Sequence, residues 1–131
     1  MSSETIRQLR DLTMELTRKP FKLAALPGFV GNVVKRYGKT TVTSILSLPT
    51  IGVVDVVMPA GEIFPMHNHD MLETVHLADG KLTIAMDDGT HRALRAPQST
   101  TIDPREAHTV LAITDSRFVC VTMPRDPGYP R

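Results

Sequence analysis

Two histidines and a glutamate lie close together in the middle of the chain, within the segment Gly61–Gly80. His67 and His69 are one residue apart, and Glu73 follows after three more residues. Imidazole and carboxylate groups are ligands that divalent transition metals accept at neutral pH. Residues two apart on an extended segment face the same side, so these side chains can point toward one ion. His108, far downstream, is a candidate fourth ligand, and together the four residues predict a metal site.

A pair of histidines alone is weak support for such a site. Histidine pairs in loops are usually solvated and bind nothing, and short motifs match by chance. Here the pair is followed by Glu73, is flanked by glycines at Gly61 and Gly80, and has a partner histidine later in the chain. Because these spacings agree with one another, they favour the metal site over a solvated pair.

The same segment resembles the first motif of the cupin superfamily, and the chain resembles its small single-domain members with one conserved barrel. The match has no gap and runs in the order Gly61, five residues, His67-Asn68-His69, three residues, Glu73, six residues and Gly80.

A second cupin motif is matched more loosely. Pro104 stands for its proline, Glu106 replaces a turn glycine, and His108 comes one residue early, while Ala112 lies near the asparagine position. The resemblance covers residues 41–123.

This resemblance implies that His67, His69, Glu73 and His108 bind the metal, with His108 placed by a shortened turn. Three imidazoles and one carboxylate suit iron, manganese, nickel, copper or zinc, and the ligand types do not choose among them. The resemblance also implies chemistry on small organic acids or ketones, of the dioxygenase, decarboxylase, lyase or isomerase type. Some cupins only bind a ligand, so a non-catalytic module that senses a metal or a small molecule is the alternative.

The rest of the sequence must supply a scaffold of strands for these ligands. Turn residues separate eight short segments rich in β-branched side chains, and Asp88-Gly89 is a strong hairpin pattern. No helical pattern separates the segments, so we expect an antiparallel, all-β fold, closed as a jelly-roll barrel of the RmlC-like cupin type. The eight segments are 40–48, 51–58, 71–78, 81–87, 90–96, 99–103, 109–114 and 117–123.

Three regions are expected along the 131 residues. Residues 1–40 form an N-terminal helix to about Arg18 and then an irregular arm, because apolar residues first recur at helical spacing and glycines and prolines follow. Residues 41–123 form the cupin barrel. Residues 124–131 hold three prolines and form an extended tail.

The charge of the chain is unevenly distributed. Residues 1–40 carry eight Lys or Arg against three acids, whereas residues 41–131 carry seven against eleven. The basic residues of segment 1–40 are scattered along it, and no nucleic-acid recognition motif accompanies them. Binding to nucleic acid is therefore not expected. A solvated face, or a surface that docks on the acidic body of a second subunit, explains it better, and we expect a homodimer.

Location and catalysis are less defined by the sequence. The single cysteine, Cys120, permits no internal disulfide, and no apolar run is long enough to span a membrane, so a cytoplasmic protein is expected.

No catalytic residue stands out. His76 has the opposite strand parity to Glu73 and should face away from the metal. Met58, Met66, Met71 and Met86 are expected to fill the core. Alternatively, they and Phe64 can line an apolar pocket for a small substrate that has one chelating end.

Overall fold

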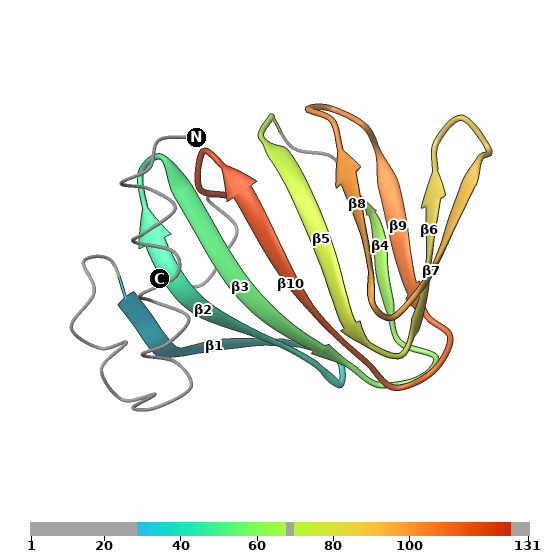
Figure 1. Cartoon of the computed structure of the whole chain (residues 1–131), viewed down its shortest axis with the longest axis horizontal. Helices are drawn as coiled ribbons and strands as arrows, with labels where there is room; N and C mark the ends of the chain where they lie inside the picture. Colours follow the sequence, from blue (N-terminus) through green and yellow to red (C-terminus); the bar gives the residue numbers. More distant parts are fainter. Residues whose placement is uncertain (1–28, 68–69, 127–131) are drawn as a thin grey trace.

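A computed structural model describes residues 29–67 and 70–126, with side chains described from Val34 onward. All ten elements in these residues are strands, arranged in two antiparallel sheets. The six-stranded sheet has the order β1-β2-β3-β10-β5-β8, and the four-stranded sheet has the order β4-β9-β6-β7 (Figure 1). The strands are β1 (Phe29–Tyr37), β2 (Thr40–Leu48), β3 (Ile51–Met58), β4 (Ile63–His67), β5 (Leu72–Asp79), β6 (Lys81–Met86), β7 (His91–Arg95), β8 (Gln98–Ile102), β9 (His108–Ala112) and β10 (Ser116–Met123).

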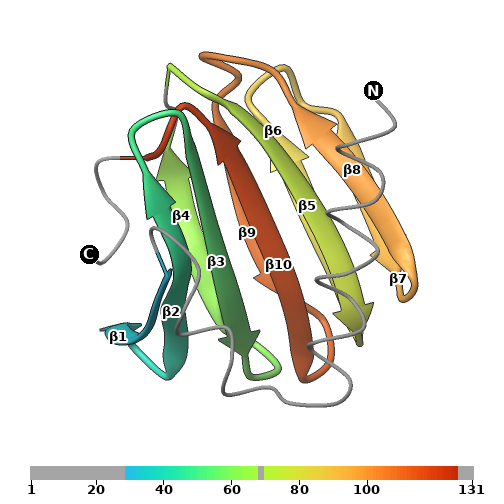
Figure 2. The same ribbon diagram turned by 60° about the vertical axis from the view of Figure 1, so that its left-hand side comes forward.

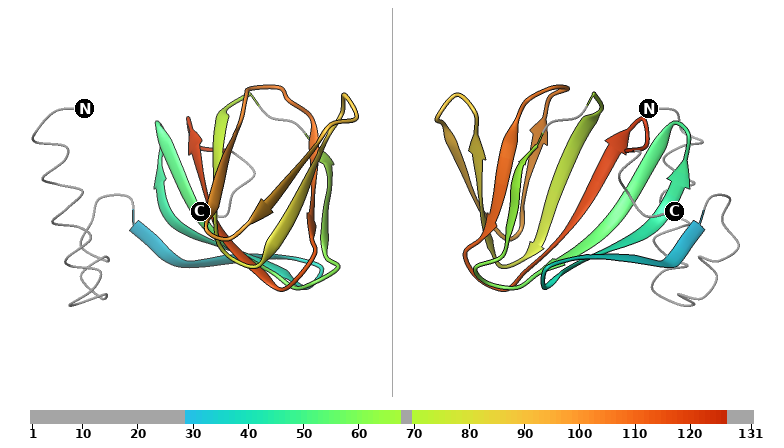
Figure 3. Two further views of the ribbon diagram at one scale, coloured as in Figure 1. Left: turned by 45° about the vertical axis from the view of Figure 1, so that its right-hand side comes forward. Right: turned by 180° about the vertical axis from the view of Figure 1, so that it is seen from behind.

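The two sheets face each other in the expected jelly-roll arrangement. Figure 2 shows the six-stranded sheet in front of β4 and β9, and the views in Figure 3 show the sheets converging at one end of the strands and spreading at the other. Neighbouring strands in this fold often lie far apart in sequence: β10 pairs with both β3 and β5. The site is therefore assembled from segments that are distant along the chain.

The core lies between the sheets and follows the period of two expected for strands with one buried face. On β3, the alternate residues Val54, Val56 and Met58 are buried, and on β10 Phe118 and Cys120 are buried. Each fully buried side chain of this size contributes roughly 1.5–3 kcal/mol to folding. Cys120 is a buried core residue, as its apolar surroundings in the sequence indicated.

Turn chemistry sets the ends of several strands. The predicted Asp88-Gly89 hairpin joins β6 to β7, with Gly89 at a φ of 89°. The Thr90 hydroxyl and backbone N–H both donate to Asp88, which holds the pKa of that exposed carboxyl below its ordinary value. The β1–β2 turn places Gly38 at a φ of 60°, a conformation that glycine adopts without steric cost.

Two strands were absent from the sequence-based prediction. We expected residues 20–40 to be irregular, but over Phe29–Tyr37 this is wrong, because these residues form β1 and pair with β2. The second strand is β4, which carries His67. The predicted N-terminal helix lies outside the described residues, as does the end of the tail beyond residue 126. No helix in the described part of the chain has the length and apolarity needed to cross a membrane.

Candidate metal centre

His67 and His108 are direct neighbours across two paired strands. His67 ends β4 and is the register partner of His108, which begins β9. Their ring centroids are 4.3 Å apart, with an angle of 58° between the ring planes. His108 is fully buried, whereas His67 is exposed at the edge of the site. The topology thus brings together two of the predicted ligands that are 41 positions apart in the sequence.

A bulge in β4 turns His67 toward the interior. Phe64 pairs with Val110 and His67 pairs with His108, so two residues of β4 stand opposite the single residue Thr109 of β9. In a regular strand, side chains three apart face opposite sides, and the extra residue of a bulge corrects this parity. As a result Phe64 and His67 both line the same cavity.

Glu73 approaches from the opposite sheet. It lies on β5, and its buried side chain faces inward like those of Val75 and Leu77. The Glu73 Oε2 atom is 3.9 Å from Nε2 of His108. Two ligand atoms that each lie about 2 Å from one ion can be at most about 4 Å apart, so this separation is compatible with a shared ion.

The ring orientation of both histidines is set by the same kind of hydrogen bond. Nδ1 of His67 lies 2.8 Å from the carbonyl oxygen of Pro65, and Nδ1 of His108 lies 2.8 Å from that of Glu106. A carbonyl oxygen only accepts, so each Nδ1 carries a proton, and the neutral form of each ring has its lone pair on Nε2. Metal-binding histidines are oriented by such bonds to their second nitrogen.

The donor types of these side chains suit a divalent transition metal, and one predicted ligand lies outside the described residues. His69, the remaining predicted ligand, lies in the undescribed pair 68–69. Within residues 29–67 and 70–126, no group of three or more His, Cys, Asp or Glu side chains is close enough to hold a metal ion. Assignment of the four ligands consequently stays a prediction.

The shortened second motif delivers His108 through an unusual turn. Arg105 has a φ of 66°, in the left-handed region that favours glycine. The Glu106 carboxylate accepts a hydrogen bond from the Asp103 backbone N–H, and its Oε2 lies 3.3 Å from the guanidinium of Arg92. Glu106 thus stabilises the turn with its side chain at the position where the family motif has a glycine.

The glycines that flank the first motif have different roles. Gly61 and Gly80 both have positive φ, 85° and 92°. A Cβ atom on Gly61 would meet nothing within 4 Å, whereas one on Gly80 would lie 2.3 Å from the carbonyl oxygen of Asp115. Gly80 is therefore required both for its backbone conformation and for the close approach of the chain between β9 and β10.

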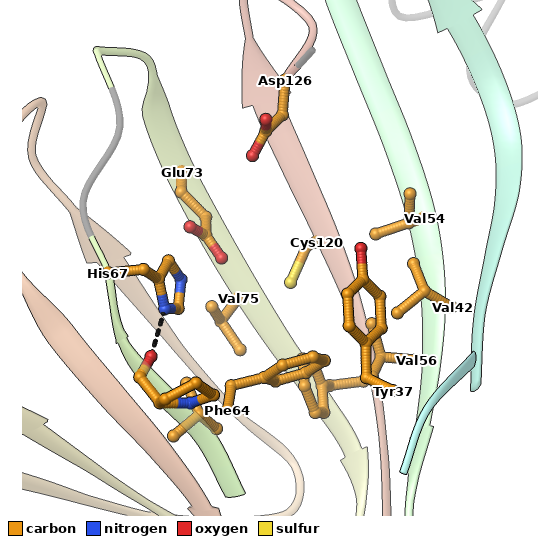
Figure 4. Close-up of a pocket in the computed structure, with 13 residues that line it drawn as sticks. Tyr37, Val42, Val54, Val56, Phe64, His67, Glu73, Val75, Cys120 and Asp126 are labelled. Atoms are coloured by element: carbon orange, nitrogen blue, oxygen red, sulfur yellow. Dashed lines mark hydrogen bonds between the residues drawn. The ribbon is translucent and has the colours of Figure 1, made fainter. Parts of the chain in front are cut away.

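A cavity of about 300 Å³ adjoins these residues. His67 and Glu73 stand at one side, and most of the remaining wall is apolar (Figure 4). Phe64 lines the cavity. Met58, Met71 and Met86 are buried core residues, as expected, whereas Met66 is exposed. The lining residues are Tyr37, Val42, Val54, Val56, Phe64, Pro65, His67, Glu73, Val75, Val110, Phe118, Cys120 and Asp126.

Tyr37 and Asp126 also line the cavity, and no motif in the sequence predicted this. Tyr37 lies outside the buried core and is partly exposed, and its ring packs edge-on against Phe64 with centroids 5.5 Å apart. The Lys39 backbone N–H donates to the Glu62 carboxylate and holds the β1–β2 turn beside β4. The one local signal for Tyr37 is its place on a strand, β1, because alternate side chains of a strand face the same side.

His76 faces away from the candidate metal centre, as its position on the strand predicted. His76 is exposed on β5, with Nδ1 2.8 Å from the Ser99 hydroxyl. On β9, His108 and Val110 are buried and Thr109 is only half-buried, so His108 and Val110 share the inward face of this strand. Asp70 forms an exposed ion pair with Arg105 at 3.1 Å.

Comparisons with known proteins agree with this architecture. The cupin domain family model matches residues 54–124. A search of curated proteins finds no match. An RmlC-like cupin from Shewanella frigidimarina superposes with a TM-score of 0.70 at 15% identity, covering 78% of this chain and 95% of the other.

Two further solved structures show the same fold at low sequence identity. KdgF from Halomonas sp. gives a TM-score of 0.68 at 16% identity and covers 76% of this chain and 94% of its own. Ectoine synthase from P. lautus gives 0.63 at 19% identity, with 70% and 68% covered. With its jelly-roll sheets, its first motif and a family match over more than half its length, the chain belongs to the cupin superfamily as a small single-domain member.

Proposed function

We propose that this cupin is a metal-dependent enzyme acting on a small organic acid or ketone. His67, His69, Glu73 and His108 would hold a divalent transition metal beside the cavity. The observation that carries the proposal is the shared orientation of two described histidines: the Nδ1 atom of each donates to a backbone carbonyl, so Nε2 is the atom that each ring would present to a metal.

A bound metal would supply Lewis-acid activation of a substrate oxygen. The chain's own residues then define the rest of the chemistry. The apolar walls bind the carbon skeleton and exclude water, which strengthens electrostatic interactions inside the cavity. Glu73 offsets one positive charge of a dication, so the site keeps an attraction for an anionic oxygen. The cavity volume of about 300 Å³ is at the small end for ligand sites and favours a small substrate.

The reaction class rests on the family. A dioxygenase, decarboxylase, lyase or isomerase reaction is compatible with a chelating substrate held next to a metal. The similar structures include one named ectoine synthase, which supports an enzymatic use of this fold. At 19% identity this likeness transfers the fold alone, so the substrate of that enzyme is not assigned to this chain.

A non-catalytic sensing module is the second candidate. The excess of five positive charges in residues 1–40 favours it, because such a region can dock on a partner when a ligand binds to the barrel. Turnover separates the two candidates: a sensor binds metal and ligand without consuming the ligand.

Metal analysis of protein purified without chelator is the first test. We expect about one transition metal per chain in the wild type and a large loss of metal in His67→Ala. The matched variant His76→Ala should keep its metal, because this imidazole faces the outer side of β5. A dioxygen-consumption and substrate-depletion screen with small diketones and organic acids would then test turnover. Metal-free wild-type protein, or equal loss in both variants, would refute the proposal.

A further inference from the structure

Glu106 contacts His108 through its backbone and the rest of the barrel through its side chain. Its carbonyl oxygen lies 2.8 Å from Nδ1 of His108, a contact in which the ring nitrogen donates. A hydrogen bond to the second ring nitrogen selects the tautomer of a metal-binding histidine and orients its ring. The direction in which His108 presents Nε2 therefore depends on how firmly the Glu106 carbonyl is held.

Two reciprocal hydrogen bonds with Asp103 close the turn that ends at Glu106. The Glu106 backbone N–H donates to the Asp103 carbonyl at 3.1 Å, and the Glu106 Oε1 atom accepts from the Asp103 backbone N–H at 2.9 Å. Pro104 and Arg105, which has a φ of 66°, occupy the two central positions, as is typical of a type II turn. The two bonds fix the backbone of Glu106 in this turn.

Arg92 connects the same turn to a neighbouring strand. From β7, its guanidinium donates to the Thr101 carbonyl at 2.6 Å and to the Thr100 hydroxyl at 3.3 Å, both on β8. Its Nη2 atom also lies 3.3 Å from Oε2 of Glu106. The side chains of Arg92 and Glu106 are 33% and 32% exposed, so solvent screens this ion pair less than a fully exposed one. The Glu106 carboxylate is thus held from two directions.

We propose that Glu106 and Arg92 are positioning residues of the candidate metal centre, which hold the Glu106 carbonyl against His108 and so keep Nε2 directed toward Glu73. In the second cupin motif a turn glycine stands where this chain has Glu106, and a glycine has no side chain to make these bonds. The inference deepens the proposed function and rests on it for metal binding, whereas the orientation of the ring can be measured without a metal.

Nitrogen-15 NMR of the histidine rings in metal-free, full-length protein tests the positioning directly. At about pH 8, above the ordinary imidazole pKa of about 6.5, we expect Nδ1 of His108 to carry a proton in the wild type. Glu106→Ala removes both side-chain bonds and should give a measurable share of the tautomer with the proton on Nε2 alone. Arg92→Ala leaves the bond to Asp103 in place and should shift the tautomer in the same direction by a smaller amount.

Titration with Zn²⁺ gives a second measurement on the same variants. Glu106→Ala should bind the ion about 10–100-fold more weakly than the wild type, the usual cost of losing a residue that orients a ligand. Glu106→Gln should lose less, because its amide oxygen can still accept one of the two bonds. The matched control is Arg117→Ala, which removes a bidentate ion pair with Asp55 on the outer face of the other sheet and should change neither measurement.

The two measurements separate this inference from the proposed function. An unchanged His108 tautomer in Glu106→Ala that circular dichroism shows to be folded would overturn the positioning role, as would an equal tautomer shift in Arg117→Ala. Unchanged Zn²⁺ affinity in Glu106→Ala would overturn it as well. A shifted tautomer in a protein whose wild type binds no metal would support the positioning of the ring and refute the proposed function. If Glu106→Ala does not fold, Glu106→Gln provides the same comparison.

Discussion

At the scale of single residues, His108 has the most constrained place in the site. It is fully buried, bonded through Nδ1 to the Glu106 carbonyl, and 3.9 Å from Glu73 through Nε2. A buried imidazole in contact with a carboxylate and a second imidazole has few roles other than binding a proton or a metal. The geometry therefore favours His108 as a ligand although its motif is shortened.

His108→Ala should preserve the fold and weaken metal binding. We expect the affinity to fall by at least the roughly 10–100-fold that loss of a supporting residue costs, and any turnover to disappear. Metal titration checks the affinity, and circular dichroism checks the fold. Thr109→Ala is the matched control, because this neighbour on β9 has the opposite parity. Full metal occupancy in His108→Ala would show that the site uses three ligands.

Arg105 offers a prediction about the turn that delivers His108. Its φ of 66° is costly for a residue with a side chain, so Arg105→Gly should raise the free energy of unfolding by about 1 kcal/mol. The lost ion pair with Asp70 is exposed on both sides and adds little. Denaturant unfolding measures the change. Arg95→Gly, on strand β7, should instead destabilise the protein, and destabilisation by Arg105→Gly would contradict this account.

At the scale of elements, the sequence predicted the regular strands well. β2 and β3 have the predicted bounds, because both are rich in β-branched residues and the turn at Pro49 separates them. β4 was missed because Pro65 interrupts its pattern, and proline is accepted there only at an edge strand with a bulge. Local pattern cannot show that β9 will pair with this irregular segment.

The site was predicted in the same uneven way. His67, Glu73 and His108 could be named as candidate ligands because their residue types and spacing match a motif. The fold places His108 next to both His67 and Glu73, and their role as ligands stays a prediction. Tyr37 and Asp126 could not be predicted to line the cavity, because long-range contacts place them there. The β1–β2 turn contacts Glu62, and Arg125 contacts the β2–β3 turn. No local pattern carries that information.

The link between β5 and β6 also gives a prediction at this scale. Gly80→Ala should destabilise the fold by about 3 kcal/mol, since positive φ and the clash with the Asp115 carbonyl add up. Gly61→Ala has the same backbone strain without the clash and should cost about 1 kcal/mol. Thermal and denaturant unfolding compare the two variants. Equal losses would mean that the close approach at Gly80 has no energetic consequence.

At the scale of the whole molecule, the described sheets end in edge strands. β1 and β8 border one sheet, and β4 and β7 border the other. Exposed edges promote pairing with other chains unless they are covered. The exposed apolar residues Val34 on β1 and Ile63 on β4 add surface that a partner can bury. These features support the expectation of a symmetric dimer, the commonest oligomer.

The charge distribution makes that dimer testable. Residues 1–40 carry a net charge of +5 and residues 41–131 carry −4. The basic segment 1–40 of one chain can therefore dock on the acidic barrel of another. We expect a dimer mass by light scattering at micromolar concentration, and a weaker dimer after deletion of residues 1–18. Raising the salt from about 0.1 M to about 1 M shortens the screening length from about 10 to about 3 Å and should also weaken it. A monomer at low salt would exclude the dimer. A dimer whose strength does not depend on salt would indicate that the apolar edge strands form the contact and that the basic segment 1–40 does not contribute to it.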